Sequence, residues 1–287
     1  MNQKVRDLEK VSFGIAIMFG IYWLYTIFIQ QYLPTSIFIN NLIGLIILYV
    51  IGLFLFMFVI KDIDSQKYQK NKISFKTIIF SFLLQCTAML VLIILVNVLL
   101  LLGVNQTSTD INSTSPAMIF MLLIFNPILE EFVFRKLIAD KLLKYGEAFY
   151  ILVSSYCFAI LHGVSLGFVN IIYTFILGLI WSYLLVKTGS FLLVVFMHAI
   201  SNLFNAIIIQ ILLNISIKMV SIYMMIILLL GIIGLILFVI NRKKIIVDNK
   251  IIFSDKTVIK DVISNKGILF YTILTLIIMI IKCLICL

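Results

Sequence analysis

One apolar run with an acidic pair inside it decides how this chain folds. Residues 117–135 read AMIFMLLIFNPILEEFVFR. About 20 apolar residues are enough to cross a bilayer as a helix, so the run predicts a transmembrane segment. Glu130 and Glu131 lie inside it, although charged groups are costly to place in hydrocarbon. Ionisable residues kept at that cost mark a functional site, and we expect their partners on other membrane helices.

The composition of the whole chain excludes a water-soluble fold. Of 287 residues, 63% are hydrophobic and 12% are charged, whereas soluble domains contain roughly 45–50% apolar and 25% charged residues. The chain is therefore predicted to be an all-α polytopic membrane bundle of about eight to nine transmembrane helices. A net charge of +10 would suggest nucleic acid in a soluble protein. Here it indicates topology, and we expect no nucleic-acid partner.

Nine runs have the length and hydropathy of a membrane helix. They are Val11–Ile29, Ile37–Ile60, Thr77–Leu102, Ala117–Phe134, Ala148–Leu166, Phe168–Val186, Phe191–Leu213, Met219–Ile240 and Gly267–Leu287. We divide this one structural domain into N-terminal helices (1–116), a core with the polar residues (117–213) and C-terminal helices with a basic loop (214–287). Small side chains at Gly178 and Ser182 predict close approach of another helix.

Lysine and arginine collect in alternate connections between these runs. Residues 1–10, 61–76, 135–144 and 242–266, together with Lys187, hold 20 of the 22 basic residues. By the positive-inside rule these segments and the N-terminus are predicted to be cytoplasmic. An odd number of spans then places the C-terminus outside. We expect a multi-pass protein of the cell membrane that also contacts lipid through its basic loops.

The spacing around the acidic pair assigns different roles to its two members. Glu131 and Arg135 are four residues apart and share one helix face, whereas Glu130 points about 100° away. Arg135 can therefore hold Glu131 as an ion pair. Glu130 is left free to act as a general acid or base.

The chain has two histidines, and both fall inside predicted spans. His162 follows Phe158 by four residues, and His198 precedes Asn202 by four. The second spacing puts an imidazole and an amide on one helix face. Both groups can donate hydrogen bonds to an oxyanion.

Three motifs in this order, EExxxR, FxxxH and HxxxN, give the chain a family resemblance over roughly residues 117–205. It resembles the CPBP family of CAAX prenyl proteases and bacteriocin-processing membrane proteins, also called the Abi family, which contains intramembrane glutamate proteases. The resemblance implies that Glu131 and Arg135 form a supporting ion pair. The matching residues are Glu130, Glu131, Arg135, Phe158, His162, His198 and Asn202.

The same resemblance implies catalytic roles for four of these residues. Glu130 with His162 would activate a water molecule. His198 with Asn202 would form the oxyanion hole. The expected activity is an intramembrane endopeptidase that needs no cofactor.

Three other readings of the same residues stay open. Residues 163–167 form GxSxG, so Ser165 with His198 resembles the dyad of a rhomboid-type serine protease. Glu130 with the two histidines could bind zinc. A non-catalytic protein is the third: a transporter with a proton relay through Glu130 and His162, or a bacteriocin-immunity or signalling protein that retains the fold.

The cysteines suggest no metal or redox centre. They lie in apolar stretches, and the CxxC at the C-terminus is interpreted as packing of a helix end. The four are Cys86, Cys157, Cys283 and Cys286.

The expected substrate is a membrane-associated peptide or lipidated protein cleaved near the cytoplasmic face. Maturation of a bacteriocin or pheromone, immunity and CAAX-type cleavage all fit, and the sequence leaves the oligomeric state open. Counting 1.5 Å per residue places Glu130 and His198 about 10 Å from that face, but His162 about 21 Å from it. A recessed or kinked helix, or wrong helix boundaries, must account for the difference.

Overall fold

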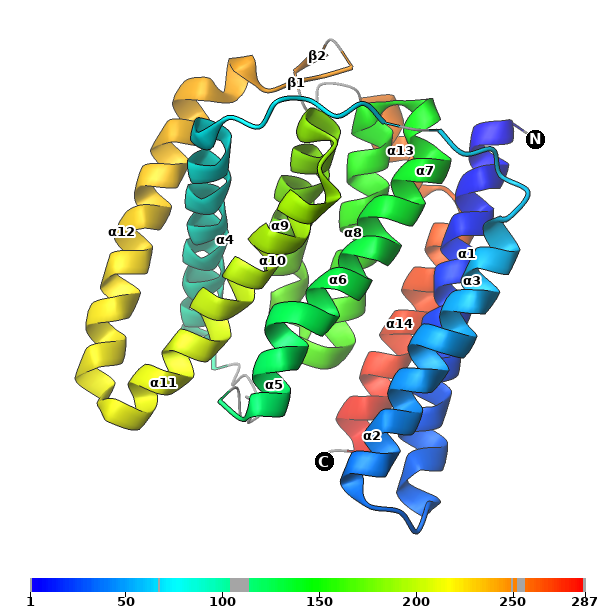
Figure 1. The fold of residues 1–287 in the computed structure, drawn as a ribbon, viewed down its shortest axis with the longest axis horizontal. Coiled ribbons are helices and arrows are strands. Elements are labelled where there is room, and N and C mark those ends of the chain that lie inside the picture. The colour runs from blue at the N-terminus through cyan, green and yellow to red at the C-terminus, as the bar shows by residue number, and fades with distance from the viewer. Residues whose placement is uncertain (1, 67, 104–113, 249, 252–255, 286–287) are drawn as a thin grey trace.

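The computed structural model describes residues 2–66, 68–103, 114–248, 250–251 and 256–285. Within these ranges the chain is an almost entirely helical bundle (Figure 1). Nine helical stretches of the described chain are long and apolar enough to cross a membrane. The predicted polytopic all-α fold is therefore confirmed.

Four of these spans are single α-helices, and five include short π- or 3-10-helical stretches, labelled η, that continue the α-helix. The first four spans comprise α1 (Gln3–Leu24) with η1 (Tyr25–Ile29) and η2 (Gln30–Tyr32); α2 (Ile37–Ile46), η3 (Ile47–Gly52) and α3 (Leu53–Ile60); α4 (Phe75–Leu101); and α5 (Pro116–Phe120), η4 (Met121–Phe125), α6 (Asn126–Glu131), η5 (Phe132–Leu137), α7 (Ile138–Leu142) and η6 (Leu143–Tyr145). The other five comprise α8 (Glu147–Leu166); α9 (Phe168–Thr188); α10 (Phe191–Asn202), η7 (Leu203–Ile207) and α11 (Ile208–Ile215); α12 (Ile217–Asn241) with η8 (Arg242–Lys244); and α14 (Lys266–Ile285). Between the last two lie β1 (Ile246–Val247), β2 (Lys250–Ile251) and α13 (Lys256–Ile263), and β1 pairs with β2 in antiparallel register.

The helix that carries the acidic pair runs further than its hydropathy predicts. It extends from Pro116 to Tyr145, whereas the prediction ended it at Phe134. Basic residues after Phe134 lower the hydropathy, but Ile138 and Leu142 among them are fully buried. One apolar face therefore keeps the helix in the bundle where hydropathy alone would end it.

The lysine- and arginine-rich segments lie together at one end of the bundle (Figure 1). Lys144 Nζ lies 3.1 Å from the buried carboxylate of Asp7, and Lys187 Nζ lies 2.9 Å from Glu147. The grouping fits the positive-inside pattern, and the side of the membrane on which it lies stays a prediction. We call this the basic end; it holds the described parts of residues 2–10, 61–74, 136–147, 187–190 and 242–266. The far end holds residues 33–36, 167 and 216 and the last turn of α14.

Helices α8 and α9 approach closely through small side chains. A Cβ atom added to Gly178 would lie 2.9 Å from the Cα of Ser155. Four residues on, Ser182 Oγ lies 2.9 Å from Ser154 Oγ, which donates to the carbonyl of Phe134. The close approach predicted at Gly178 and Ser182 is confirmed, and it ties the helix of the acidic pair to this hairpin.

We expect Gly178→Ala to destabilise the protein by about 1–3 kcal/mol, because the new methyl group would overlap the backbone of α8. The matched control is Gly20→Ala, whose methyl would meet only Leu274 Cδ2 at 3.6 Å. That change should be neutral or slightly stabilising, since alanine favours a helix over glycine. Thermal unfolding of the two variants in detergent checks this, and equal melting temperatures would contradict the close approach.

Candidate active site

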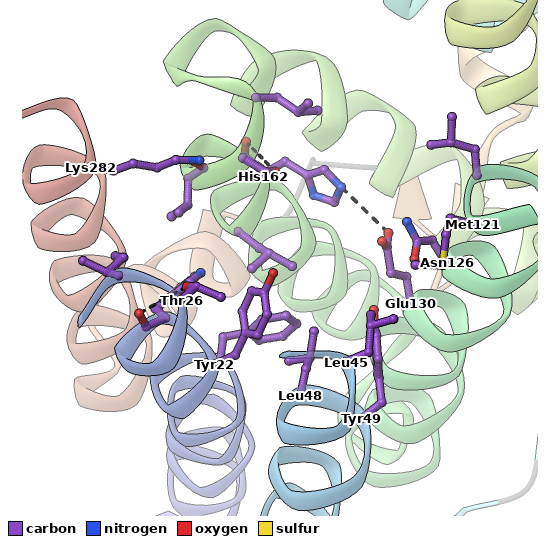
Figure 2. A pocket seen from close by; sticks show the side chains of 18 of the residues that line it. Tyr22, Thr26, Leu45, Leu48, Tyr49, Met121, Asn126, Glu130, His162 and Lys282 are labelled. Carbon is purple, nitrogen blue, oxygen red and sulfur yellow. Dashed lines mark hydrogen bonds and ion pairs between the residues drawn. The ribbon is translucent and has the colours of Figure 1, made fainter. Parts of the chain in front are cut away.

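Three of the predicted site residues converge on one point. Glu130 Oε2 lies 3.8 Å from His162 Nε2 and 3.9 Å from His198 Nε2. The residues come from α6, α8 and α10, and Figure 2 shows the side chains of Glu130 and His162 pointing toward each other. The structure thus brings together an acid and two bases from three separate helices.

The turn at Gly146 explains why Glu130 and His162 meet. Gly146 has φ +119°, a conformation that glycine adopts far more readily than other residues. It reverses the chain between η6 and α8, and Glu130 and His162 each lie sixteen residues from it. At 1.5 Å per residue both are therefore about 24 Å along a helix from the same turn. The sequence predicted different depths for Glu130 and His162 because it ended the helix that carries Glu130 too early, at Phe134.

A buried chain of contacts joins Arg135 to His198 through Glu131. Glu131 Oε2 lies 3.0 Å from Arg135 Nε, and both side chains are 0% exposed. Glu131 Oε1 accepts a hydrogen bond from His198 Nδ1 at 2.8 Å. The first contact is the i, i+4 pair that the spacing predicts. The second was not foreseen, and it makes Glu131 the residue that orients His198.

Aromatic rings enclose the guanidinium group of Arg135. Its Cζ lies 4.2 Å from the ring centre of Phe158 and 5.4 Å from that of Trp181. Trp181 in turn stacks on His198, with ring centres 4.3 Å apart and planes at 21°. Within the described chain, the three guanidinium nitrogens have no hydrogen bond of good geometry. Cation–π and ion-pair attraction therefore hold the group in place.

Hydrogen bonds at Nδ1 determine which nitrogen each histidine turns toward Glu130. His162 Nδ1 lies 2.8 Å from the carbonyl of Phe158, and His198 Nδ1 bonds Glu131. A carbonyl or an ion-paired carboxylate only accepts, so Nδ1 carries the proton in both rings. When the rings are neutral, both Nε2 atoms are bare and face the same Glu130 oxygen. These atoms can then only accept hydrogen bonds, so a hydrogen-bond donor is favoured between them. A water molecule can donate two such bonds.

The spacing of these atoms suits a bridging water better than a tetrahedral metal ion. Zinc held at about 2.0–2.1 Å would bring its ligand atoms to about 3.4 Å from one another. The two Glu130–histidine separations are 3.8 and 3.9 Å. Hydrogen bonds of about 2.8 Å to one shared water span such separations easily. The residues could bind zinc only after moving inward by about 0.5 Å.

Asn202 lies one turn beyond His198, and both residues line the same cavity. Its Nδ2 donates a hydrogen bond to the carbonyl of Leu122 at 2.8 Å. An amide has two N–H groups, so one stays available to a ligand. The bond to Leu122 fixes the orientation of the amide.

The cavity at the site has a volume of about 710 Å³. From Glu130 its lining extends to Gln31, Met118, Leu166 and Lys282, all close to the far end of their helices. The sequence predicted access from the basic end. The cavity instead lies between the site and the far end of the bundle. On the side of the basic end, the helix of the acidic pair continues beyond Phe134 as buried turns and fills the space.

Helices that precede the polar core supply one wall of this cavity (Figure 2). Tyr49 of η3 packs edge-on against Phe125, with ring centres 5.6 Å apart. Its hydroxyl makes no hydrogen bond within the described chain. Tyr49, Trp181 and Lys282 were not predicted as site residues. The one sequence feature that could have indicated Lys282 is that charged residues are rare inside the last span.

Ser165 also lines the cavity, but it forms no dyad. Its hydroxyl donates to the carbonyl of His162 in the same helix at 3.4 Å. Among the residues that the structure describes, it makes no hydrogen bond with His198. Cys283 is exposed, and Cys286 of the CxxC sequence lies outside the described residues.

Comparison with known families identifies the segment that holds the site. Residues 112–204 match the family model described as type II CAAX prenyl endopeptidase, Rce1-like. This is about a third of the chain, and it includes all three sequence motifs. Comparisons with curated proteins and with solved structures give no match.

We expect Arg135→Met to lower the free energy of unfolding by about 3–5 kcal/mol, because it leaves the Glu131 carboxylate buried without its cation. Adding Glu131→Gln to the same chain should recover most of this loss. Lys136→Met is the control, since the neighbouring lysine is only partly buried. Denaturant unfolding in detergent measures all three, and a loss no larger than that of Lys136→Met would contradict the buried pair.

Proposed function

We propose that this chain hydrolyses peptide bonds within the membrane by a glutamate mechanism, because residues 112–204 match the Rce1-like model of type II CAAX prenyl endopeptidases. The observation that carries the proposal is the convergence of His162 Nε2 and His198 Nε2 on one oxygen of Glu130. We assign the chemistry to residues 117–213 and treat the helices before and after as parts of the same domain.

Glu130 and His162 are suited to activate a water molecule. A water between them could donate one proton to Glu130 and approach His162 Nε2 with the other. Its oxygen would then attack the scissile carbonyl carbon. The proton taken from the water would pass to the departing amine as the C–N bond breaks, which leaves a free carboxylate and a free amine.

His198 and Asn202 are suited to stabilise the oxyanion of the tetrahedral intermediate. Asn202 has a free N–H, but His198 can donate from Nε2 only when both ring nitrogens are protonated. Glu131 accepts from His198 Nδ1 and so holds the ring with Nε2 on the side of Glu130.

The cavity supports a membrane-associated peptide or a lipidated protein as the substrate. Its walls carry apolar and aromatic side chains interspersed with polar ones, both beside Glu130 and toward the far end, where Gln31 and Lys282 lie. Such a surface suits a substrate that already lies in the bilayer. Bacteriocin or pheromone maturation, immunity and CAAX-type processing all involve substrates of this kind. We further propose a cell-membrane location with the basic end and the N-terminus in the cytoplasm.

We expect Glu130→Gln to reduce cleavage by about 10²–10⁴-fold, because the amide keeps the shape of the side chain but cannot take a proton from water. Purified protein in detergent, a membrane-associated peptide and mass spectrometry provide the measurement. Melting temperature shows whether the variant is folded.

Ser165→Ala is the matched control and should cleave at the rate of the unmodified protein. An inactive Ser165→Ala beside an active Glu130→Gln would favour the serine mechanism instead. Activity in the presence of a strong chelator should also persist, and its loss would favour zinc.

We expect Asn202→Ala to lower kcat by about 10²–10³-fold with a small change in KM, because an oxyanion donor acts mainly in the transition state. Steady-state kinetics with the same peptide check this. Asn205→Ala provides a control one turn further on, where the amide bonds Tyr173 and Ser201. A rise in KM with kcat unchanged would place Asn202 in substrate binding.

A further inference from the structure

The cavity carries formal charges of opposite sign at separate positions on its lining. Among its lining residues, Glu130 is the only acid and Lys282 is the only lysine or arginine. In Figure 2 the two lie on opposite sides of the cavity, with His162 between them. Lys282 belongs to α14, outside the segment that matches the endopeptidase family.

A hydrogen bond holds the Lys282 ammonium group at the cavity. Its Nζ donates to the carbonyl of Val164 at 3.0 Å, in the last turn of α8, where carbonyls lack partners within the helix. The lysine lies near the end of α14 and is exposed, and its ammonium group turns toward α8. Two of its three N–H groups stay free. Within the described chain no carboxylate pairs with it.

The distance from Lys282 to the catalytic groups fits a short piece of peptide. Val164 follows His162 by two residues, and Lys282 Nζ touches the Val164 carbonyl. The ammonium group is therefore on the order of 10 Å from the His162 ring. About three residues of extended chain span that distance.

We propose that Lys282 binds a carboxylate of the peptide substrate within about three residues of the scissile bond. The carboxylate is either the C-terminal group of the substrate or an acidic side chain. The ammonium group at the cavity lining has two free N–H groups, and a carboxylate can bind it through charge-assisted hydrogen bonds. Lys282 would thus determine which peptides are cleaved, and the assignment rests on the proposed endopeptidase function.

Three sets of N-myristoylated synthetic peptides with randomised central residues test this. One set ends in a free carboxylate, the second ends in an amide and lacks acidic residues, and the third is amidated with one internal glutamate. Each is incubated with purified protein in phosphatidylcholine vesicles, and mass spectrometry gives cleavage sites and kcat/KM. The proteins are the unmodified chain, Lys282→Gln, Lys282→Arg and Lys266→Gln, an exposed lysine at the basic end of the same helix.

We expect the unmodified chain to cleave one of the anionic sets about tenfold faster than the neutral set, mainly through KM. The anionic set that is cleaved faster shows whether the carboxylate is the C-terminal group or an acidic side chain. Lys282→Gln should lose this preference without slowing the neutral set, while Lys282→Arg and Lys266→Gln keep it.

Cleavage of all sets at equal rates by the unmodified chain would overturn the assignment and leave the endopeptidase function standing. An equal slowing of all sets by Lys282→Gln would also overturn it. No cleavage of any set by the unmodified chain would count against the proposed function itself, and the role of Lys282 would fall with it.

Discussion

The buried ion pair between Glu131 and Arg135 is the interaction on which the site depends. Two fully buried charges are stable only when each has further favourable contacts, because desolvation otherwise exceeds their attraction. Here the carboxylate also binds His198, and the guanidinium lies against the rings of Phe158 and Trp181. These contacts join the helix of the acidic pair to α8, α9 and α10. The position of His198 in the site is thus determined by a pair that need not touch a substrate.

The rotation of about 100° per residue in a helix lets two adjacent glutamates do different things. Glu131 faces the bundle interior and is held by Arg135 and His198. Glu130 faces the cavity, and no lysine or arginine of the described residues forms an ion pair with it. Because the two residues are adjacent in one helix, the carboxylate that we propose to react starts from a backbone position fixed beside the held one. Both lie against the same histidine, Glu131 at Nδ1 and Glu130 3.9 Å from Nε2.

Properties that are local in sequence were predictable, and properties that depend on helix contacts were not. Nine spans followed from apolar length, and the pairing of Glu131 with Arg135 followed from a spacing of four residues. The continuation of the fourth helix past Phe134 depends on burial of one face against other helices. Trp181 looked like any aromatic residue in a chain with 13% aromatic residues, because its stacking on His198 joins two different helices. The direction of the cavity was missed for the same reason as the helix end.

The contrast between the matched segment and its surroundings has a physical basis. Proton transfer and oxyanion binding require atoms at fixed separations, so few arrangements of Glu130, His162, His198 and Asn202 can work. A cavity wall has only to offer a surface of suitable shape and polarity, which many sequences provide. Helices α1, α2 and α14 supply much of that wall and lie outside residues 112–204. Under the proposed function, the reaction type would therefore be shared with the matched family, and the flanking helices, including the one that carries Lys282, would determine which substrates this chain admits.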